Sequence, residues 1–241
     1  MISIWAGALG VIAGAIAAVA GFGIGSLLTP LLALAIGTKL AVAAVSIPHL
    51  LGTALRFWWM REYIDRRVLW RFGLTSAAGG LLGAWLHTRA SNPVLTPVFA
   101  GLLIFAGIMG LTGLAERLQF KGVWAWMAGA LSGVFGGLVG NQGGIRSAAM
   151  LGLKVPRDAF VATATAIALM VDGVRVPVYL FTEGHRLRPM WPLIGVATAG
   201  VLIGTIGGGR MLKRIPEKLF RRIVAVLVLA LGLWMFLRNG E

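Results

Sequence analysis

Long apolar runs alternate with short polar connectors along the whole of this 241-residue chain. Most runs are close to the ~20 residues that an α-helix needs to cross the hydrocarbon core of a bilayer. They lack the alternation of polar and apolar residues that marks a membrane β-barrel. The pattern therefore predicts an all-α polytopic membrane protein. The apolar runs cover residues 2–20, 26–36, 40–60, 68–88, 94–114, 122–139, 144–153, 158–181, 190–209 and 217–237.

Two glycine-rich breaks interrupt this pattern, one around residues 21–25 and one around residues 140–146. The runs that follow them, 26–36 and 144–153, are too short to cross a membrane at ~1.5 Å per residue. Backbone outside a helix persists at membrane depth only where protein or a polar cavity satisfies its N–H and C=O groups. The breaks are therefore predicted to form re-entrant hairpins that line a functional site.

The two breaks belong to an apparent internal duplication of the chain. A shift of 119 positions pairs one break with the other and Arg56 with Arg175. It also repeats the order of break, short helix and arginine-bearing helix, which is stronger evidence than single identities in so apolar a sequence. We therefore divide the single membrane domain into a first repeat, 1–114, and a second repeat, 115–241.

Basic residues between the apolar runs indicate the orientation of the chain in the membrane. Connectors 61–71 and 210–222 are the richest in Arg and Lys, and both are predicted to be cytoplasmic. The duplication equates them with weakly charged stretches of the opposite half, so we expect an inverted repeat. One re-entrant hairpin and three transmembrane helices per half satisfy this inversion. The alternative, eight ordinary spans, would place the two basic connectors on opposite faces.

Composition supports the same class of protein and limits the partners that are expected. Hydrophobic residues make up 58% of the chain and charged residues 12%, and the mean hydropathy is +0.87. No soluble globule of this length has such values. The Arg and Lys residues of the connectors, which set the orientation in the membrane, account for the net charge of +14. No nucleic-acid partner is therefore expected. Without cysteine or a His/Asp/Glu cluster at metal-ligand spacing, neither a metal nor another cofactor is predicted.

The motifs of the two halves resemble those of a known family. Each half opens with Gly-x-Gly-x-Gly or a variant, runs into a short helix and reaches an Ala-rich stretch bearing Ser46 or Thr165. Over essentially the whole chain this pattern is similar to the TauE/SafE sulfite-exporter-like permeases. The resemblance implies transport of a small anion such as sulfite or an organosulfonate. The second half departs from the pattern, with Gln142 where a glycine is usual and Ala149 where a proline is usual.

Arg146 is the strongest candidate for binding an anion. It follows the second break, where free N–H groups and the positive end of a half-helix favour a negative charge. Its guanidinium can donate paired hydrogen bonds to two sulfonate oxygens. The alternative is an arginine that only caps backbone carbonyls of the opposite hairpin. The predicted substrate-binding set is Asn141, Gln142, Gly143, Gly144 and Arg146 with Gly23, Gly25 and Ser26.

A second group of polar residues is predicted to line the pathway or to couple transport to another ion. Asp172 and Arg175 lie three residues apart on one helix and can neutralise each other. Asp172 can alternatively carry a proton, so proton coupling is a hypothesis. His49 is expected to be a packed neutral histidine, with a proton relay as the alternative. His87 and His185 are expected at the membrane interface. The group is completed by Arg56, Ser46 and Thr165.

These patterns together predict a multi-pass secondary transporter of the cell membrane, inner or plasma, that moves a small anion by alternating access around two hairpins. An anion channel with a fixed pore is the alternative within transport, and a structural or assembly subunit is the alternative outside it. An enzyme is not expected, because Ser26 and Ser147 have no evident base partner. The sequence determines neither the direction of transport nor the exact anion, and it leaves a homo-oligomer open.

Overall fold

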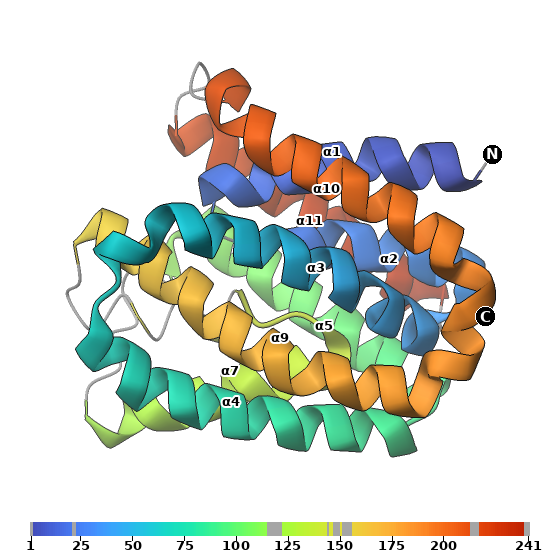
Figure 1. Ribbon diagram of the computed structural model, residues 1–241, viewed down its shortest axis with the longest axis horizontal. Helices are drawn as coiled ribbons and strands as arrows, with labels where there is room; N and C mark the ends of the chain where they lie inside the picture. Colours follow the sequence, from blue (N-terminus) through green and yellow to red (C-terminus); the bar gives the residue numbers. More distant parts are fainter. Residues whose placement is uncertain are drawn as a thin grey trace.

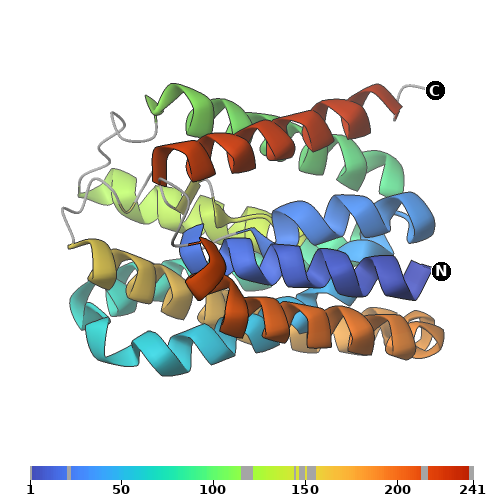
Figure 2. The same ribbon diagram turned by 90° about the horizontal axis from the view of Figure 1, so that it is seen from above.

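The computed structural model describes residues 2–20, 23–114, 122–143, 145–146, 150, 156–212 and 217–238. Over these residues the chain is an α-helical bundle without strands (Figures 1 and 2). The helices are α1 Ile2–Ala20, α2 Ile24–Ile36, α3 Thr38–Met60, α4 Arg66–Arg89, α5 Asn92–Thr112, α7 Val123–Val139, α9 Arg157–Leu187, α10 Trp191–Leu212 and α11 Glu217–Arg238, with 3-10 turns η1 Arg61–Tyr63 and η2 Arg188–Met190.

The length and apolar character of these helices fit a membrane protein. Three described stretches are long and apolar enough to cross a bilayer: Thr38–Tyr63, Asn92–Thr112 and Asp158–Gly208. The last contains α9 and α10, which run in opposite directions (Figure 1). Many large apolar side chains are exposed on the outside of the bundle, among them Phe181, which is 93% exposed. Such a surface suits contact with lipid rather than with water.

The two ends of the bundle differ in which chain segments they carry. α1 begins and α11 ends at one end (Figures 1 and 2). The opposite end carries η1, the end of α10 and the start of α11 (Figure 1). The helix ends that flank both arginine-rich connectors therefore lie at the same end of the molecule.

Helices related by the 119-residue shift have equivalent neighbours. α1 packs on α10 as α7 packs on α4, and α3 packs on α10 as α9 packs on α4. α3 also packs on α9, and α5 on α11. Within each related pair, α1 and α7, α3 and α9, α4 and α10, and α5 and α11, the two helices run in opposite directions (Figure 1). For these four described pairs, replacing each helix by its counterpart gives the same contacts with the helix direction reversed.

Glycines allow close packing at two equivalent helix crossings, that of α4 with α7 and that of α10 with α1. A Cβ on Gly83 of α4 would overlap the carbonyl oxygen of Val134 in α7. A Cβ on Gly204 of α10 would overlap the carbonyl oxygen of Val11 in α1. Small residues of this kind let membrane helices pack backbone to backbone. One crossing contains α1 and the other contains α7, and these are the helices that lead into the two glycine breaks.

The central position of α3 keeps its polar side chains away from lipid. Every residue from Leu40 to Ser46 is buried, so all sides of α3 contact protein there. One sequence expectation at the bundle periphery is wrong: His87 is buried rather than interfacial, and its Nδ1 lies 2.7 Å from the carbonyl oxygen of Leu138. The cause is the close crossing of α4 and α7, which covers this part of α4. His185 is exposed, as expected.

Candidate functional site

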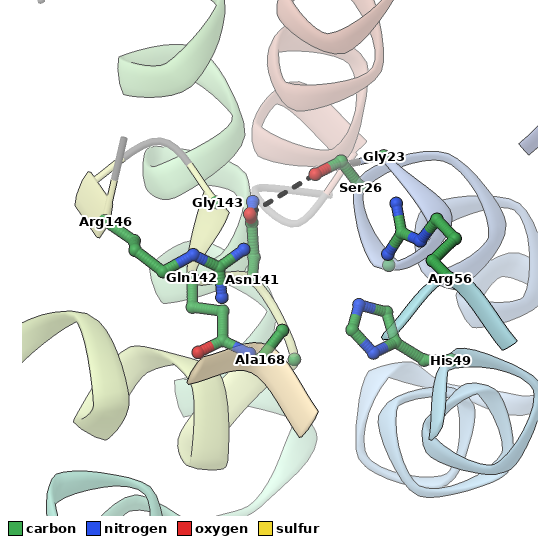
Figure 3. Close-up of a pocket in the computed structure, with 11 residues that line it drawn as sticks. Gly23, Ser26, His49, Arg56, Asn141, Gln142, Gly143, Arg146 and Ala168 are labelled. Atoms are coloured by element: carbon green, nitrogen blue, oxygen red, sulfur yellow. Dashed lines mark hydrogen bonds between the residues drawn. The ribbon is translucent and has the colours of Figure 1, made fainter. Parts of the chain in front are cut away.

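The two glycine breaks contact each other inside the bundle, where Gly25 and Ser26 meet Gly140 and Asn141 (Figure 3). α2 begins after Gly23, with φ 132°, and α7 ends at Gly140, with φ 74°; both angles favour glycine. A Cβ on Gly25 would lie 2.5 Å from Gly140 O, so this approach also requires glycine. Ser26 Oγ donates a 3.2 Å hydrogen bond to Asn141 Oδ1 and joins the breaks directly (Figure 3).

A small cavity lies where the breaks meet the central helices α3 and α9. Its free volume is roughly that of one water molecule. The polar lining comes from Asn141, Gln142 and Arg146 on one side and His49 and Arg56 of α3 on the other (Figure 3). All five are buried. Two guanidinium groups thus line one small cavity, and no carboxylate is among the described residues that line it.

Arg146 is held in the turn that follows the second break. Its backbone N–H donates to Gln142 O at 3.1 Å, which restarts a helical turn after residues 140–142. The residue is only 3% exposed. In the described part of the chain, neither Nε nor Nη1 has a hydrogen-bond partner. No described carbonyl of the first break accepts from Nε or Nη1, so these two donors do not support a carbonyl-capping arginine.

Asn141 and Gln142 add neutral donors to the same cavity. The Asn141 amide uses its oxygen to accept from Ser26, and its nitrogen has no partner among the described residues. Ser132 Oγ donates to the backbone oxygen of Gln142 at 3.0 Å and fixes the chain there. The side-chain amide of Gln142 also lacks a described partner at both its nitrogen and its oxygen. The departure from glycine at this position therefore places a free amide at the cavity.

Arg56 reaches the cavity from α3. Its Nη1 donates to the carbonyl oxygen of Ala17 near the end of α1, and its Nη2 donates to Thr53 Oγ1 at 3.3 Å. Its Nε has no partner within the described residues. The sequence placed Arg56 near the end of a span, in the pathway group. The structure instead brings it to the cavity shared with Arg146.

The ion pair predicted from spacing on α9 forms. Arg175 Nε and Nη2 each lie 2.8 Å from Asp172 Oδ1, and both residues are buried. Arg175 Nη1 donates to Gly136 O at 2.9 Å, near the end of α7. Tyr179, a further turn along α9, donates its hydroxyl to Gly137 O. The charge of Arg175 is therefore neutralised within the protein, and its side chain fixes the end of α7.

His49 connects this ion pair to the cavity. Its Nδ1 lies 2.6 Å from Asp172 Oδ2, across the interface between α3 and α9. Its side chain is 10% exposed and lines the cavity. The packed histidine expected from sequence is therefore bonded to a carboxylate 123 positions away. Local sequence carries no signal for this pair, because the two residues belong to different halves.

The remaining predicted residues are only partly gathered here. Gly23, Gly25, Ser26 and Gly143 line the cavity. Ser46 donates to Ala43 O at 2.7 Å, one turn back on its own helix, and Thr165 is buried; neither lines the cavity. Gly144, Ser147 and Ala149 lie outside the described residues. The sequence missed Ala168 of the lining, although the 119-residue shift pairs it with His49.

The cavity presents hydrogen-bond donors and positive charge, an arrangement that favours a negatively charged group. Five side-chain nitrogens have hydrogens to donate and no partner among the described residues: Arg56 Nε, Asn141 Nδ2, Gln142 Nε2, Arg146 Nε and Arg146 Nη1. Buried donors without partners are costly, and buried unpaired charges more so. An anion has the acceptors that such donors require. No three His, Asp or Glu side chains in the described part come together as a metal site requires.

Fold and site together define a helical membrane protein with a cation-lined cavity between two helix breaks, an arrangement typical of secondary transporters. A family model described as Sulfite exporter TauE/SafE matches residues 6–235. The chain therefore belongs to this family of membrane permeases, and the resemblance noted in the sequence is confirmed. No curated protein and no solved structure matches the chain.

Proposed function

We propose that this protein is a secondary transporter that moves a small sulfur oxyanion or organosulfonate by alternating access. The observation that carries the proposal is the set of buried donors without partners around the cavity. The charges agree with it. Arg175 is paired with Asp172, whereas Arg56 and Arg146 have no described carboxylate within ion-pair distance. The site therefore has an excess of positive charge, which one small anion offsets.

The arrangement of donors suits a tetrahedral or pyramidal oxyanion. Guanidinium groups approach from two sides, Arg56 from α3 and Arg146 from the second break (Figure 3). The Asn141 side chain lies between them, and the Gln142 side chain lies beside the Arg146 guanidinium (Figure 3). Each oxygen of a sulfite or sulfonate group accepts from more than one donor, and guanidinium forks match such oxygen pairs. A carboxylate offers two oxygens and uses fewer of these donors.

The small size of the cavity supports a moving site rather than a fixed pore. Its free volume of about one water molecule is less than a sulfonate group needs. The breaks also contact each other through Ser26 and Asn141. Entry of the anion therefore requires the first break to separate from the second. Separation of two half-helix segments around a central site is how broken-helix transporters alternate access.

We infer that the two halves form an inverted repeat, each with a re-entrant hairpin. The exchange of neighbours between α1, α3 and α4 and their counterparts supports this, as does the reversed direction of each pair (Figure 1). The helix ends that flank both basic connectors share one end of the bundle (Figure 1). Eight ordinary spans would separate these connectors. The positive-inside rule then makes that end cytoplasmic.

An ion pair between the halves supports a state that is closed at the opposite, external end. Lys39 of α3 lies 3.4 Å from Glu183 of α9, and its ammonium also donates to Thr88 O at 2.8 Å. Arg186 lies 3.1 Å from the same carboxylate. Alternating access requires this cluster to open when the anion passes to or from the external side. A structural subunit would have no use for the costly unpaired arginines of the central cavity.

Transport by purified protein in proteoliposomes tests the proposal. Wild-type protein should show saturable uptake of labelled sulfite or methanesulfonate, and exchange across the membrane when unlabelled anion is inside. Arg146→Ala removes a central donor, so flux should fall at least about tenfold because a charged hydrogen bond contributes about 1.5–3 kcal/mol. Arg89→Ala is the matched control, since Arg89 is exposed and lies against Trp85 at the bundle surface.

The outcomes separate the competing functions. Unchanged flux in Arg146→Ala would exclude the proposed site. Flux that does not saturate and shows no exchange would indicate a channel, and absence of flux for every anion would favour a structural subunit. A thermal-shift panel of sulfite, sulfate, sulfonates and carboxylates, with salt-matched chloride controls, identifies the anion class. A ligand at 100 times its Kd should stabilise the fold by about 2.7 kcal/mol.

A further inference from the structure

His49 is the only histidine among the described residues that line the cavity, and histidine is the residue type whose ordinary pKa lies nearest neutrality. Its imidazole lies between two unlike environments. On one side is the buried Asp172 carboxylate, 2.6 Å from Nδ1. On the other side are the cavity and the donors of the second break (Figure 3). The ring therefore joins an acid that faces the protein interior to the cavity in which the anion is proposed to bind.

The contact with Asp172 determines which ring nitrogen carries the proton in neutral His49. A carboxylate accepts hydrogen bonds and donates none, so Nδ1 must carry the hydrogen. Nε2 of the neutral ring is then an acceptor with a lone pair. The edge of the ring that contains Nε2 faces the first break: Cδ2, the atom beside Nε2, would lie 3.9 Å from a Cβ on Gly25. Figure 3 shows this edge turned towards Asn141 and Arg56.

An acceptor at this position opposes the binding of an anion. The unpartnered side-chain atoms of the other described lining residues are five donor nitrogens and Gln142 Oε1. The Gln142 amide can turn its nitrogen to a bound oxyanion, whereas neutral His49, held through Nδ1, keeps its Nε2 lone pair towards the anion and repels it. Protonation of Nε2 replaces that lone pair with an N–H donor and adds a positive charge. The anion and the proton therefore stabilise each other when both are bound, which is thermodynamic linkage.

We propose that His49 is the proton-binding site of this transporter and takes up one proton at Nε2 for each anion bound. The inference rests on the proposed function and adds its coupling ion. No covalent bond of the anion breaks: the proton comes from hydronium or a buffer acid on the side where the anion enters, and it leaves with the anion on the other side. Anion and proton then move in the same direction, and His49 returns to the neutral imidazole when both have left.

Every charged group that faces His49 is consistent with this coupling. Asp172, on α9, favours the imidazolium, while Arg175 on the same helix is paired with that carboxylate. Arg56 on α3 and Arg146 beyond the second break line the same cavity and oppose a further positive charge. A bound anion offsets this opposition from the two arginines. Protonation of His49 is therefore most favourable when the anion is present, which is the property a coupled carrier needs.

Asp172 is a poorer proton acceptor than His49 in this arrangement. Its Oδ1 accepts from Nε and Nη2 of Arg175, and its Oδ2 accepts from His49 Nδ1. The carboxylate is fully buried and does not line the cavity. A proton on it would displace one of these charge-assisted bonds. Its role in this scheme is to fix the orientation of His49 and to stabilise the imidazolium.

Calorimetric titration of the purified protein with methanesulfonate tests the proposal. A sulfonate takes up no proton itself near neutral pH, unlike sulfite. Titrations in buffers of different ionisation enthalpy give the number of protons taken up per anion. Wild-type protein should take up about one proton, and above the titration of His49 the Kd should rise about tenfold per pH unit. Binding thus strengthens as the pH falls.

The variant His49→Gln gives the decisive comparison. Its amide can turn an N–H donor to the cavity at every pH, so we expect binding that is retained, independent of pH and without proton uptake. His185→Gln is the matched control, because His185 is exposed, and it should behave as wild type. Wild-type binding without proton uptake would overturn the proposal, and so would full uptake in His49→Gln. Absence of sulfonate binding in wild type would instead contradict the proposed function.

Discussion

Arg56 of α3 and Arg175 of α9 occupy corresponding places in the two halves, yet they lie in different electrostatic surroundings. Each donates from Nη1 to the last turn of the helix before a break: Arg56 to Ala17 O and Arg175 to Gly136 O. These acceptors are also related by the shift of 119 positions. Both arginines therefore stabilise the same feature, the carboxyl end of a helix that stops inside the bundle.

The difference between the two arginines comes from one residue, three positions before each. Asp172 gives Arg175 a carboxylate at 2.8 Å, whereas Thr53 gives Arg56 a hydroxyl at 3.3 Å. Arg175 is thus neutralised, while Arg56 retains its charge beside the cavity. One side-chain difference therefore separates an arginine that supports structure from an arginine suited to bind an anion. The following predictions test this comparison.

The largest expected effect is a difference in the free energy of unfolding between variants of the two arginines. Arg175→Gln leaves Asp172 buried with only His49 as partner, and loss of one member of a buried pair costs about 3–5 kcal/mol. Arg56→Gln removes a charge that has no carboxylate partner, so it should cost much less. Unfolding of both variants in detergent measures this. Equal losses for the two variants would show that the arginines have the same role.

A carboxylate introduced beside Arg56 should make it a paired arginine like Arg175. Thr53→Asp gives Arg56 the partner that Arg175 has, so the guanidinium should turn from the anion to the new carboxylate. We expect sulfonate affinity to fall by about 1.5–3 kcal/mol, roughly ten- to a hundredfold. Thr53→Asn, similar in size and uncharged, should retain most of the affinity. Calorimetric titration compares them, and equal affinities would contradict the assignment of Arg56 to the anion.

The contact between the two breaks should respond to a single methyl group. Gly25→Ala places a Cβ 2.5 Å from Gly140 O, so the halves must separate or distort. Overpacking of this kind costs about 1–3 kcal/mol, and transport should slow because the closed state is disfavoured. Gly101→Ala is the control, since a Cβ there meets nothing within 4 Å. Full transport and stability in Gly25→Ala would exclude a close approach of the breaks.

The smallest effect is expected at the hydrogen bond that joins the breaks. Ser26→Ala removes the donor to Asn141 Oδ1 and should lower stability by about 1 kcal/mol. Because the bond is made only when the breaks are together, the variant should spend more time open. Cysteine accessibility at introduced cavity positions measures this, and the chain has no native cysteine to interfere. Unaltered accessibility would mean that the bond does not hold the breaks together.

Much of this architecture follows from local sequence. The apolar runs predicted the helical membrane class, and α2 is a short helix as its run indicated. The Asp172–Arg175 pair followed from spacing, because residues three apart share one face of a helix. The meeting of His49 and Arg56 with Arg146 at one cavity did not follow from spacing, because Arg146 belongs to the other half. Nor did the burial of His87, since only the crossing of α4 and α7 covers it.

The sequence by itself determined where helices run and where they break, because periodicity and glycine content act on neighbouring residues. Only the tertiary structure decided that His49 and Arg56 of α3 meet Asn141, Gln142 and Arg146 at one cavity. It also brought the carboxylate of one half to the imidazole of the other, 123 positions away along the chain. Electrostatic pairing depends on distance in space, and packing of α3 on α9 sets that distance.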